Sequence, residues 1–133
     1  MDERNPAIGF IGAGLLGTGL ALALAARKYR VVGAYSRSLS SAQTLAERVP
    51  GCQALSSAQD VADAAELVFI TTPDSAITTV AASVAWHTGQ GVVHSCGASS
   101  VGILQVASDQ GAITGAFHPF QTFASLADPA EVV

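Results

Sequence analysis

The sequence is poor in charge and has no excess of basic residues, which excludes several classes of protein. Only 12% of its 133 residues are charged, and six lysines and arginines stand against ten acids, so the formal net charge is -4. Such a chain lacks the basic surface that attracts a nucleic-acid backbone, and no DNA or RNA partner is expected. Half of the residues are hydrophobic, which excludes a disordered chain and predicts one domain with a substantial core.

Cysteine and long apolar runs are also scarce. The two cysteines, Cys52 and Cys96, are too few for a disulfide framework and do not form a zinc site, so no metal is expected. Every apolar run is broken by glycine, proline or charge before it reaches the roughly 20 residues of a membrane-spanning helix. Residues 1–6 are polar and do not resemble a signal peptide. We therefore expect a cytoplasmic protein with no membrane partner.

The most informative stretch lies near the start, where a short apolar segment leads into the pattern Gly-x-Gly-x-x-Gly. Gly12 is expected to make a tight turn, Gly14 to let backbone approach a pyrophosphate, and Gly17 to let a helix pack closely on the preceding strand. A helix that opens at Leu15 or Leu16 directs its unpaired N–H groups and its dipole at the phosphates. This order favours dinucleotide binding, and the alternative is a purely structural glycine turn.

Apolar strand patterns and helical patterns alternate along the rest of the chain. Strands are expected over about 7–11, 31–35, 52–55, 67–71, 91–95 and 112–117, and helices over about 15–28, 41–48, 57–65, 73–86 and 100–109. Thr72 is expected to cap the fourth helix, with Pro73 at its first position, and Ser99 or Ser100 to cap the fifth. The alternation predicts an α/β fold with a doubly wound parallel sheet, the Rossmann fold, in the strand order 3-2-1-4-5-6.

The residues that follow the second strand bear on the choice of cofactor. Proteins that bind NAD usually carry an acid there, about 20 residues past the glycines, which accepts hydrogen bonds from the ribose 2′-hydroxyl. This chain has Ser36, Arg37 and Ser38 instead, which offer a guanidinium and two hydroxyls to a 2′-phosphate. NADP is therefore the predicted cofactor and NAD is less favoured. The alternative is that Arg37 is simply solvated.

Ligands of doubly wound sheets bind beyond the carboxyl ends of the strands, which identifies further candidates. The loops after the fourth and fifth strands contribute Thr71, Thr72, Pro73, Ser95, Cys96 and Gly97. We expect the first three to run past the adenosine and pyrophosphate of the cofactor, or else only to begin a helix. The last three are small, so they leave room for a nicotinamide ring and a substrate.

Histidines occur at the ends of two predicted strands. His118 precedes Pro119, in place for a substrate contact or for a catalytic proton donor, and histidine's ordinary pKa of about 6.5 suits proton transfer beside a hydride step. The alternative is that His118 only bonds a neighbouring carbonyl. His94 is expected to point inward as a hydrogen-bonded core residue. A Cys96 nucleophile paired with either histidine would need a basic cluster to stabilise the thiolate, and none is evident.

Five segments taken together resemble a family of oxidoreductases related to pyrroline-5-carboxylate reductase and to the 6-phosphogluconate dehydrogenase-like enzymes. They are residues 9–17, 36–38, 72–74, 94–100 and 115–124. The most specific are the last two, which contain His-Ser-Cys-Gly-Ala and His-Pro-Phe-Gln-Thr-Phe. Members of this family carry a Rossmann-like N-terminal domain and a helical second domain. The resemblance implies NAD(P) binding, and it does not identify a substrate.

The resemblance also implies how this chain is organised. Residues 1–133 are expected to form a single Rossmann-like domain, with 121–133 as a tail that leads to the helical domain, which would close the substrate pocket and build a homodimer. Enzymes of the 6-phosphogluconate dehydrogenase type draw a catalytic lysine from that domain, whereas Lys28 lies far from the predicted crevice. Two functions stay open: the NADP-binding domain of an oxidoreductase acting on a small carbonyl or imine, and a non-catalytic dinucleotide-binding module with a redox-sensing or regulatory role.

Overall fold

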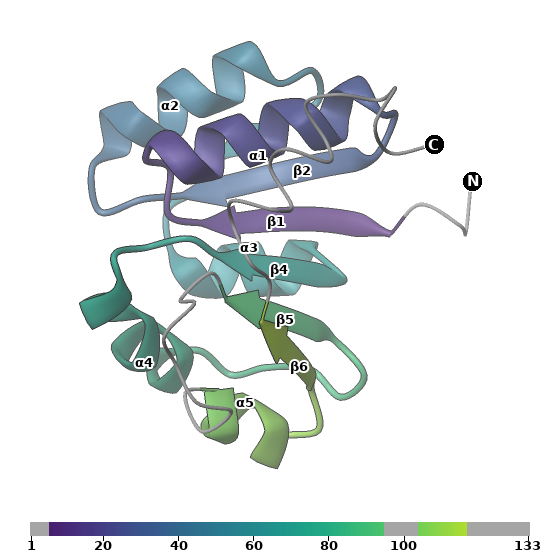
Figure 1. The fold of residues 1–133 in the computed structure, drawn as a ribbon, viewed down its shortest axis with the longest axis vertical. Coiled ribbons are helices and arrows are strands. Elements are labelled where there is room, and N and C mark those ends of the chain that lie inside the picture. The colour runs from purple at the N-terminus through teal and green to yellow at the C-terminus, as the bar shows by residue number, and fades with distance from the viewer. Residues whose placement is uncertain (1–5, 95–103, 117–133) are drawn as a thin grey trace.

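The computed structural model describes residues 6–94 and 104–116, which form one parallel sheet flanked by helices (Figure 1). The strands are β1 (Ala7–Ile11), β2 (Arg30–Tyr35), β3 (Gln53–Ala54), β4 (Leu67–Ile70), β5 (Gly91–His94) and β6 (Ile113–Ala116). The helices are α1 (Leu15–Ala26), α2 (Leu39–Arg48), α3 (Ala58–Ala64), α4 (Asp74–Ser83) and α5 (Gln105–Asp109). The sheet has the order β3-β2-β1-β4-β5-β6, and every neighbouring pair is parallel, so the predicted fold and strand order are confirmed.

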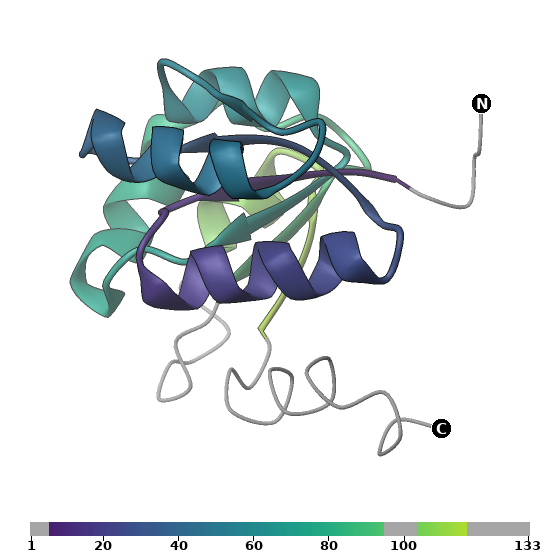
Figure 2. The ribbon, with the colours of Figure 1, turned by 90° about the horizontal axis from the view of Figure 1, so that it is seen from above.

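A hydrophobic cluster covers each face of the sheet, which lies between two helical layers (Figure 2). Phe10 points to the face covered by α1 and α2, where it packs with Leu45. The next residue along the strand, Ile11, points to the opposite face and shares a cluster with Val61 of α3 and Leu104 beside α5. Because side chains alternate along a strand, a sheet that is buried on both faces needs the nearly unbroken apolar runs seen in this sequence.

The strand order reverses between β1 and β4, and this reversal creates the place for a site. From β1 the chain moves outward through β2 to β3, whereas β4 starts again on the other side of β1 and continues to β6. Ile11, the last residue of β1, pairs with Tyr35 of β2 and with Ile70 of β4, so three strands end at one level. The loops that leave these ends diverge to opposite faces and leave a crevice between them.

The start of α4 differs from the prediction. Pro73, expected inside the helix, has an extended backbone (φ -54°, ψ 148°) and is the residue that precedes its first turn. Thr72 therefore lies one position too early to cap α4, and the predicted cap is wrong. The Thr72 hydroxyl is buried and has no hydrogen-bond partner within the described ranges. The predicted caps Ser99 and Ser100 lie outside those ranges.

The end of α4 was predicted near Trp86, but the helix ends at Ser83. The backbone N–H groups of Ala85 and Trp86 donate to the side-chain carbonyls of Gln59 and Gln110, each at 2.8 Å. These two contacts replace helical hydrogen bonds and draw the chain out of the helix. The competing amides lie 26 and 24 residues away in the sequence, so the local pattern does not reveal them.

Polar contacts close the amino end of the sheet, opposite the crevice. The buried Gln90 amide donates to two carbonyls at the end of α3, at 2.6 and 2.7 Å. On the surface nearby, His87 Nε2 lies 2.9 Å from Asp63 Oδ1. This hydrogen bond, with a second from Gln59, holds the pKa of Asp63 below its ordinary value.

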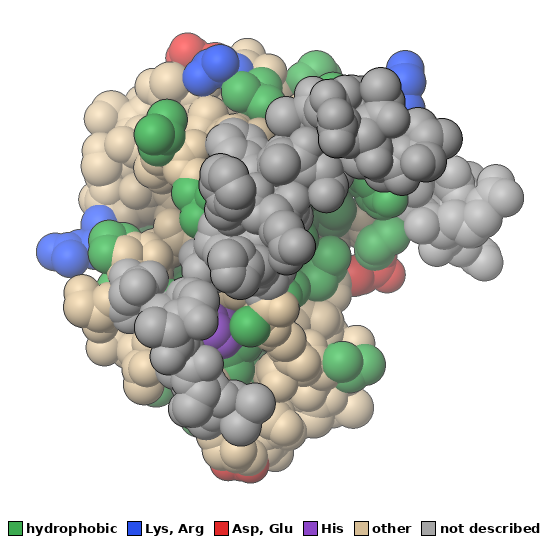
Figure 3. Space-filling model, in the orientation of Figure 1, with side chains coloured by type: hydrophobic (Ala, Val, Ile, Leu, Met, Phe, Trp, Pro, Cys, Tyr) green, Lys and Arg blue, Asp and Glu red, His purple; other side chains and the backbone are tan. Residues whose placement is uncertain are grey.

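Two further surface properties bear on partners. No helix in the described part of the chain is long and apolar enough to cross a membrane. On the face seen in Figure 3, basic side chains stand apart from one another, and no continuous basic patch forms among the coloured residues.

Candidate functional site

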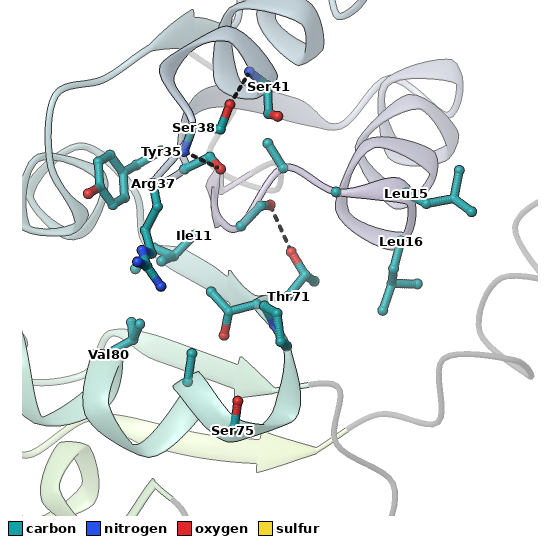
Figure 4. A pocket seen from close by; sticks show the side chains of 17 residues that line it. Ile11, Leu15, Leu16, Tyr35, Arg37, Ser38, Ser41, Thr71, Ser75 and Val80 are labelled. Atoms are coloured by element: carbon teal, nitrogen blue, oxygen red, sulfur yellow. Dashed lines mark hydrogen bonds between the residues drawn. The ribbon is translucent and has the colours of Figure 1, made fainter.

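A cleft of about 830 Å³ opens where β1, β2 and β4 end (Figure 4). Of the predicted cofactor-binding residues, it brings together Gly12, Gly14, Leu15, Leu16, Ser36, Arg37, Ser38, Thr71, Thr72 and Pro73. Gly17 lies behind the cleft, where it packs against the glycine turn. Four other predicted site residues lie outside the described ranges: Ser95, Cys96, Gly97 and His118.

The three glycines of the motif meet different requirements. Gly12 has φ +112°, and a Cβ on it would lie 2.7 Å from the backbone of Thr71 and Thr72, so only glycine makes this turn without strain. A Cβ on Gly17 would lie 2.5 Å from the Gly12 carbonyl oxygen, so the first turn of α1 packs closely against the glycine turn. A Cβ on Gly14 would meet no atom within 4 Å, because this residue faces the open cleft. A ligand can therefore approach the Gly14 backbone closely.

The carbonyl oxygens of the turn are occupied by the protein's own donors. The Thr71 hydroxyl donates to Gly12 O at 2.9 Å, the Thr18 hydroxyl donates to Ala13 O at 3.2 Å, and the Thr18 N–H donates to Gly14 O at 2.9 Å. The first N–H groups of α1 have no partner within the helix. No acidic residue lies in its first turn. The turn therefore presents donors and the positive end of a helix dipole, the arrangement that binds a phosphate.

The segment after β2 forms a second wall of the cleft. Ser38 caps α2 by accepting a hydrogen bond from the Ser41 N–H at 3.4 Å, so α2 begins at Leu39, two residues before its predicted start at Ser41. Arg37 extends from the end of β2 towards α4 (Figure 4). No described acid forms an ion pair with its guanidinium. Its charge is therefore available to a ligand in the cleft.

The third wall contains residues that sequence reasoning missed. Ala76 and Val80 of α4 line the cleft, and Tyr35 lines it from the end of β2. Ala76 and Val80 are four residues apart, so they share one face of the helix. The sequence therefore indicates that the two side chains share a helix face, but it does not show that this face lies opposite the glycine turn. The Thr71 hydroxyl, already bonded to Gly12, contributes to the site by holding the turn in place.

The structure also places the buried histidine and the described cysteine, and it bears on metal binding. His94 is buried, with 3% of its surface exposed, as predicted for a core histidine. The Cys52 thiol is half-buried, and burial raises its pKa to about 11, so its thiolate is scarce at neutral pH. Within the described ranges, no group of histidine, cysteine and acidic residues could hold a metal ion.

These features define a class, the doubly wound α/β domains with a glycine-rich, phosphate-compatible turn at the point where the strand order reverses. The model of the Rossmann-like domain family matches residues 2–119, and the chain belongs to that family. No curated protein matches the chain.

Solved structures with the same fold include several oxidoreductases. A protein of Bacteroides fragilis described as a putative NADP oxidoreductase is 20% identical with a TM-score of 0.68, over 97% of this chain and 65% of that one. An imine reductase of a Pseudomonas species is 20% identical with a TM-score of 0.71, over 88% and 43%. A reductive aminase of Aspergillus terreus, bound to NADPH4, cyclohexanone and allyl amine, is 17% identical with a TM-score of 0.72, over 88% and 44%. At these identities the likeness shows the shared fold, and this chain spans under two thirds of each structure's length.

Proposed function

We propose that this chain is the NADP-binding domain of an oxidoreductase that transfers hydride to or from a small carbonyl or imine. The glycine turn carries the proposal, because its carbonyls are bonded to the protein and its helix N-terminus is open to the cleft. In this proposal the pyrophosphate lies on the first turn of α1. The similar structures described above, which include an imine reductase and a reductive aminase bound to NADPH4, support the class of reaction.

The preference for NADP is proposed from the end of β2. An NAD site offers an acid there, which repels a 2′-phosphate, whereas this cleft has Arg37 with Ser36 and Ser38 on either side. A charge-assisted hydrogen bond contributes about 1.5–3 kcal/mol, and about 1.4 kcal/mol corresponds to a tenfold change in affinity. Partial screening at this exposed position reduces that contribution, so we expect a preference of about tenfold.

In the proposed complex, the nicotinamide supplies the hydride chemistry when the cofactor is bound. The protein supplies binding and orientation: α1 holds the phosphates, Arg37 holds the ribose phosphate, and the apolar side chains of Ala76 and Val80 flank the nucleotide. Among the cleft-lining residues whose side chains the structure describes, none is a histidine, an acid or a lysine that could donate a proton. We propose His118 as that donor.

Titration of the purified chain with NADPH and with NADH, followed by nucleotide fluorescence, tests the proposed cofactor. Arg37→Ala should weaken NADPH binding about tenfold and leave NADH binding nearly unchanged. Arg30→Ala is the matched control, because this arginine lies at the opposite end of β2 and its loss should change neither affinity. Tighter binding of NADH than of NADPH to the unmutated chain would contradict the NADP assignment.

A second candidate function is a binding module without activity of its own. It is favoured by the lack of a histidine, an acid or a lysine among the cleft-lining residues whose side chains the structure describes. Oxidation of NADPH with a panel of keto acids and cyclic imines separates the two functions. Cofactor binding without turnover, both for this chain and for a longer form, would favour the module.

A further inference from the structure

A second groove, of about 340 Å³, lies between α1 and α2 and has no role in the site described so far. It adjoins the cofactor cleft, because both are lined by Ala13, Gly14, Leu15 and Ser41. Its outer wall is α2, which contributes Ser40, Thr44 and Arg48. A phosphate bound at the start of α2 would therefore be accessible from both sides.

Arg48 reaches this groove from the last turn of α2. Ser41, Thr44 and Arg48 are spaced i, i+3 and i+7, so they follow one face of the helix. Side chains on a helix lean towards its N-terminus, and Arg48 is about 10 Å along the axis from Ser41. An extended arginine side chain covers most of that distance. The alternative reason for a cation in the last turn is its favourable interaction with the helix dipole. Arg48, however, lines the groove together with residues one and two turns before it.

The two arginines beside these cavities share a property that the other described cations lack. Arg37 and Arg48 form no ion pair or hydrogen bond with any described residue, whereas Arg27, Lys28 and Arg30 each have an interaction within the protein. Among the residues whose side chains the structure describes, no acid lines either the cleft or the groove. In a chain with a net charge of -4, these two guanidinium groups are thus left for an anion.

We propose that Arg48 is a second specificity-determining residue, which binds the 2′-phosphate of NADP from the α2 side, opposite Arg37. This inference rests on the proposed function. A phosphate monoester carries a charge of about -1.5 to -2 at neutral pH and has three acceptor oxygens, more than one guanidinium can satisfy. Ser41 lies between the cleft and the groove and marks where that phosphate is held.

The test measures the dissociation constants of NADPH and NADH for the wild type and for Arg48→Met, which keeps the aliphatic stem. We expect the constant for NADPH to rise about fivefold to tenfold, while that for NADH stays within about twofold. Adenosine 2′-monophosphate should compete less well against the variant. Arg48→Lys, which keeps the charge, should retain part of the preference. Arg30→Met is the control for loss of a positive charge elsewhere on the surface.

The outcomes separate this inference from the proposed function. If neither nucleotide binds the wild type, both fail. If Arg37→Met abolishes the preference for NADPH while Arg48→Met changes it less than about twofold, only the inference about Arg48 fails. Equal weakening of NADPH and NADH by Arg48→Met also overturns it, because the arginine would then act on the pyrophosphate or on helix packing. An unchanged melting temperature of Arg48→Met establishes that the comparison concerns binding.

Discussion

Replacing Thr71 by valine should loosen the phosphate-binding turn while keeping its shape. The Thr71 hydroxyl donates to the Gly12 carbonyl at 2.9 Å, and only 8% of the residue is exposed. Valine leaves that carbonyl without its donor and places a methyl group where the oxygen stood. A methyl group requires more room than 2.9 Å from an oxygen atom, so the turn is also pushed away from β4.

The magnitude follows from the burial of this bond. Removing the donor from a buried carbonyl costs about 1–3 kcal/mol. For a domain of this size, that corresponds to a fall in melting temperature of about 3–10 °C. The freed Gly12 carbonyl can also turn towards the cleft, where its negative end opposes a phosphate. We therefore expect NADPH to bind Thr71→Val about tenfold more weakly.

Thermal melts and NADPH titration check both expectations. Thr71→Ser keeps the hydroxyl and should bind NADPH nearly as the wild type does. Thr79→Val makes the same chemical change at an exposed position of α4 and should alter neither measurement. The reasoning is refuted if Thr71→Ser is the weaker binder, because the methyl group and not the hydroxyl would then support the turn.

Two further substitutions test other parts of the structure. Gly17→Ala should lower the free energy of unfolding and weaken NADPH binding. The new Cβ would lie 2.5 Å from a carbonyl oxygen, and such overpacking costs about 1–3 kcal/mol, which exceeds the helix-propensity gain of about 0.8–1.0 kcal/mol. A variant that is more stable in denaturant unfolding would contradict this expectation. His87→Ala should raise the pKa of Asp63 towards its ordinary value of 3.8, as followed by NMR titration. Because the pKa of Asp63 is depressed in the folded state, the stability contributed by this contact is present above pH 3.8 and is lost as the pH falls through the lower folded value. An unchanged Asp63 titration in the variant would show that the contact is not made.

The cap of α4 shows where local patterns mislead. Thr72-Pro73-Asp74 reads as cap, first residue and first turn, but Pro73 is extended and α4 begins at Asp74. Both arrangements satisfy the restricted φ of proline, so the sequence does not choose between them. The end of α4 depends on Gln59 and Gln110, which lie in other elements and compete for its backbone.

The sequence by itself determined the strand order and the roles of Gly12 and Gly17, because these follow from the alternation of short elements and from the sterics of one local turn. Only the tertiary structure showed that the Thr71 hydroxyl holds the Gly12 carbonyl, across 59 residues. Only it placed Arg48 in a groove that adjoins the cleft. The physical reason is that backbone conformation is encoded by neighbours within a few positions, whereas the pairing of a donor with a distant acceptor depends on how whole helices and strands are packed.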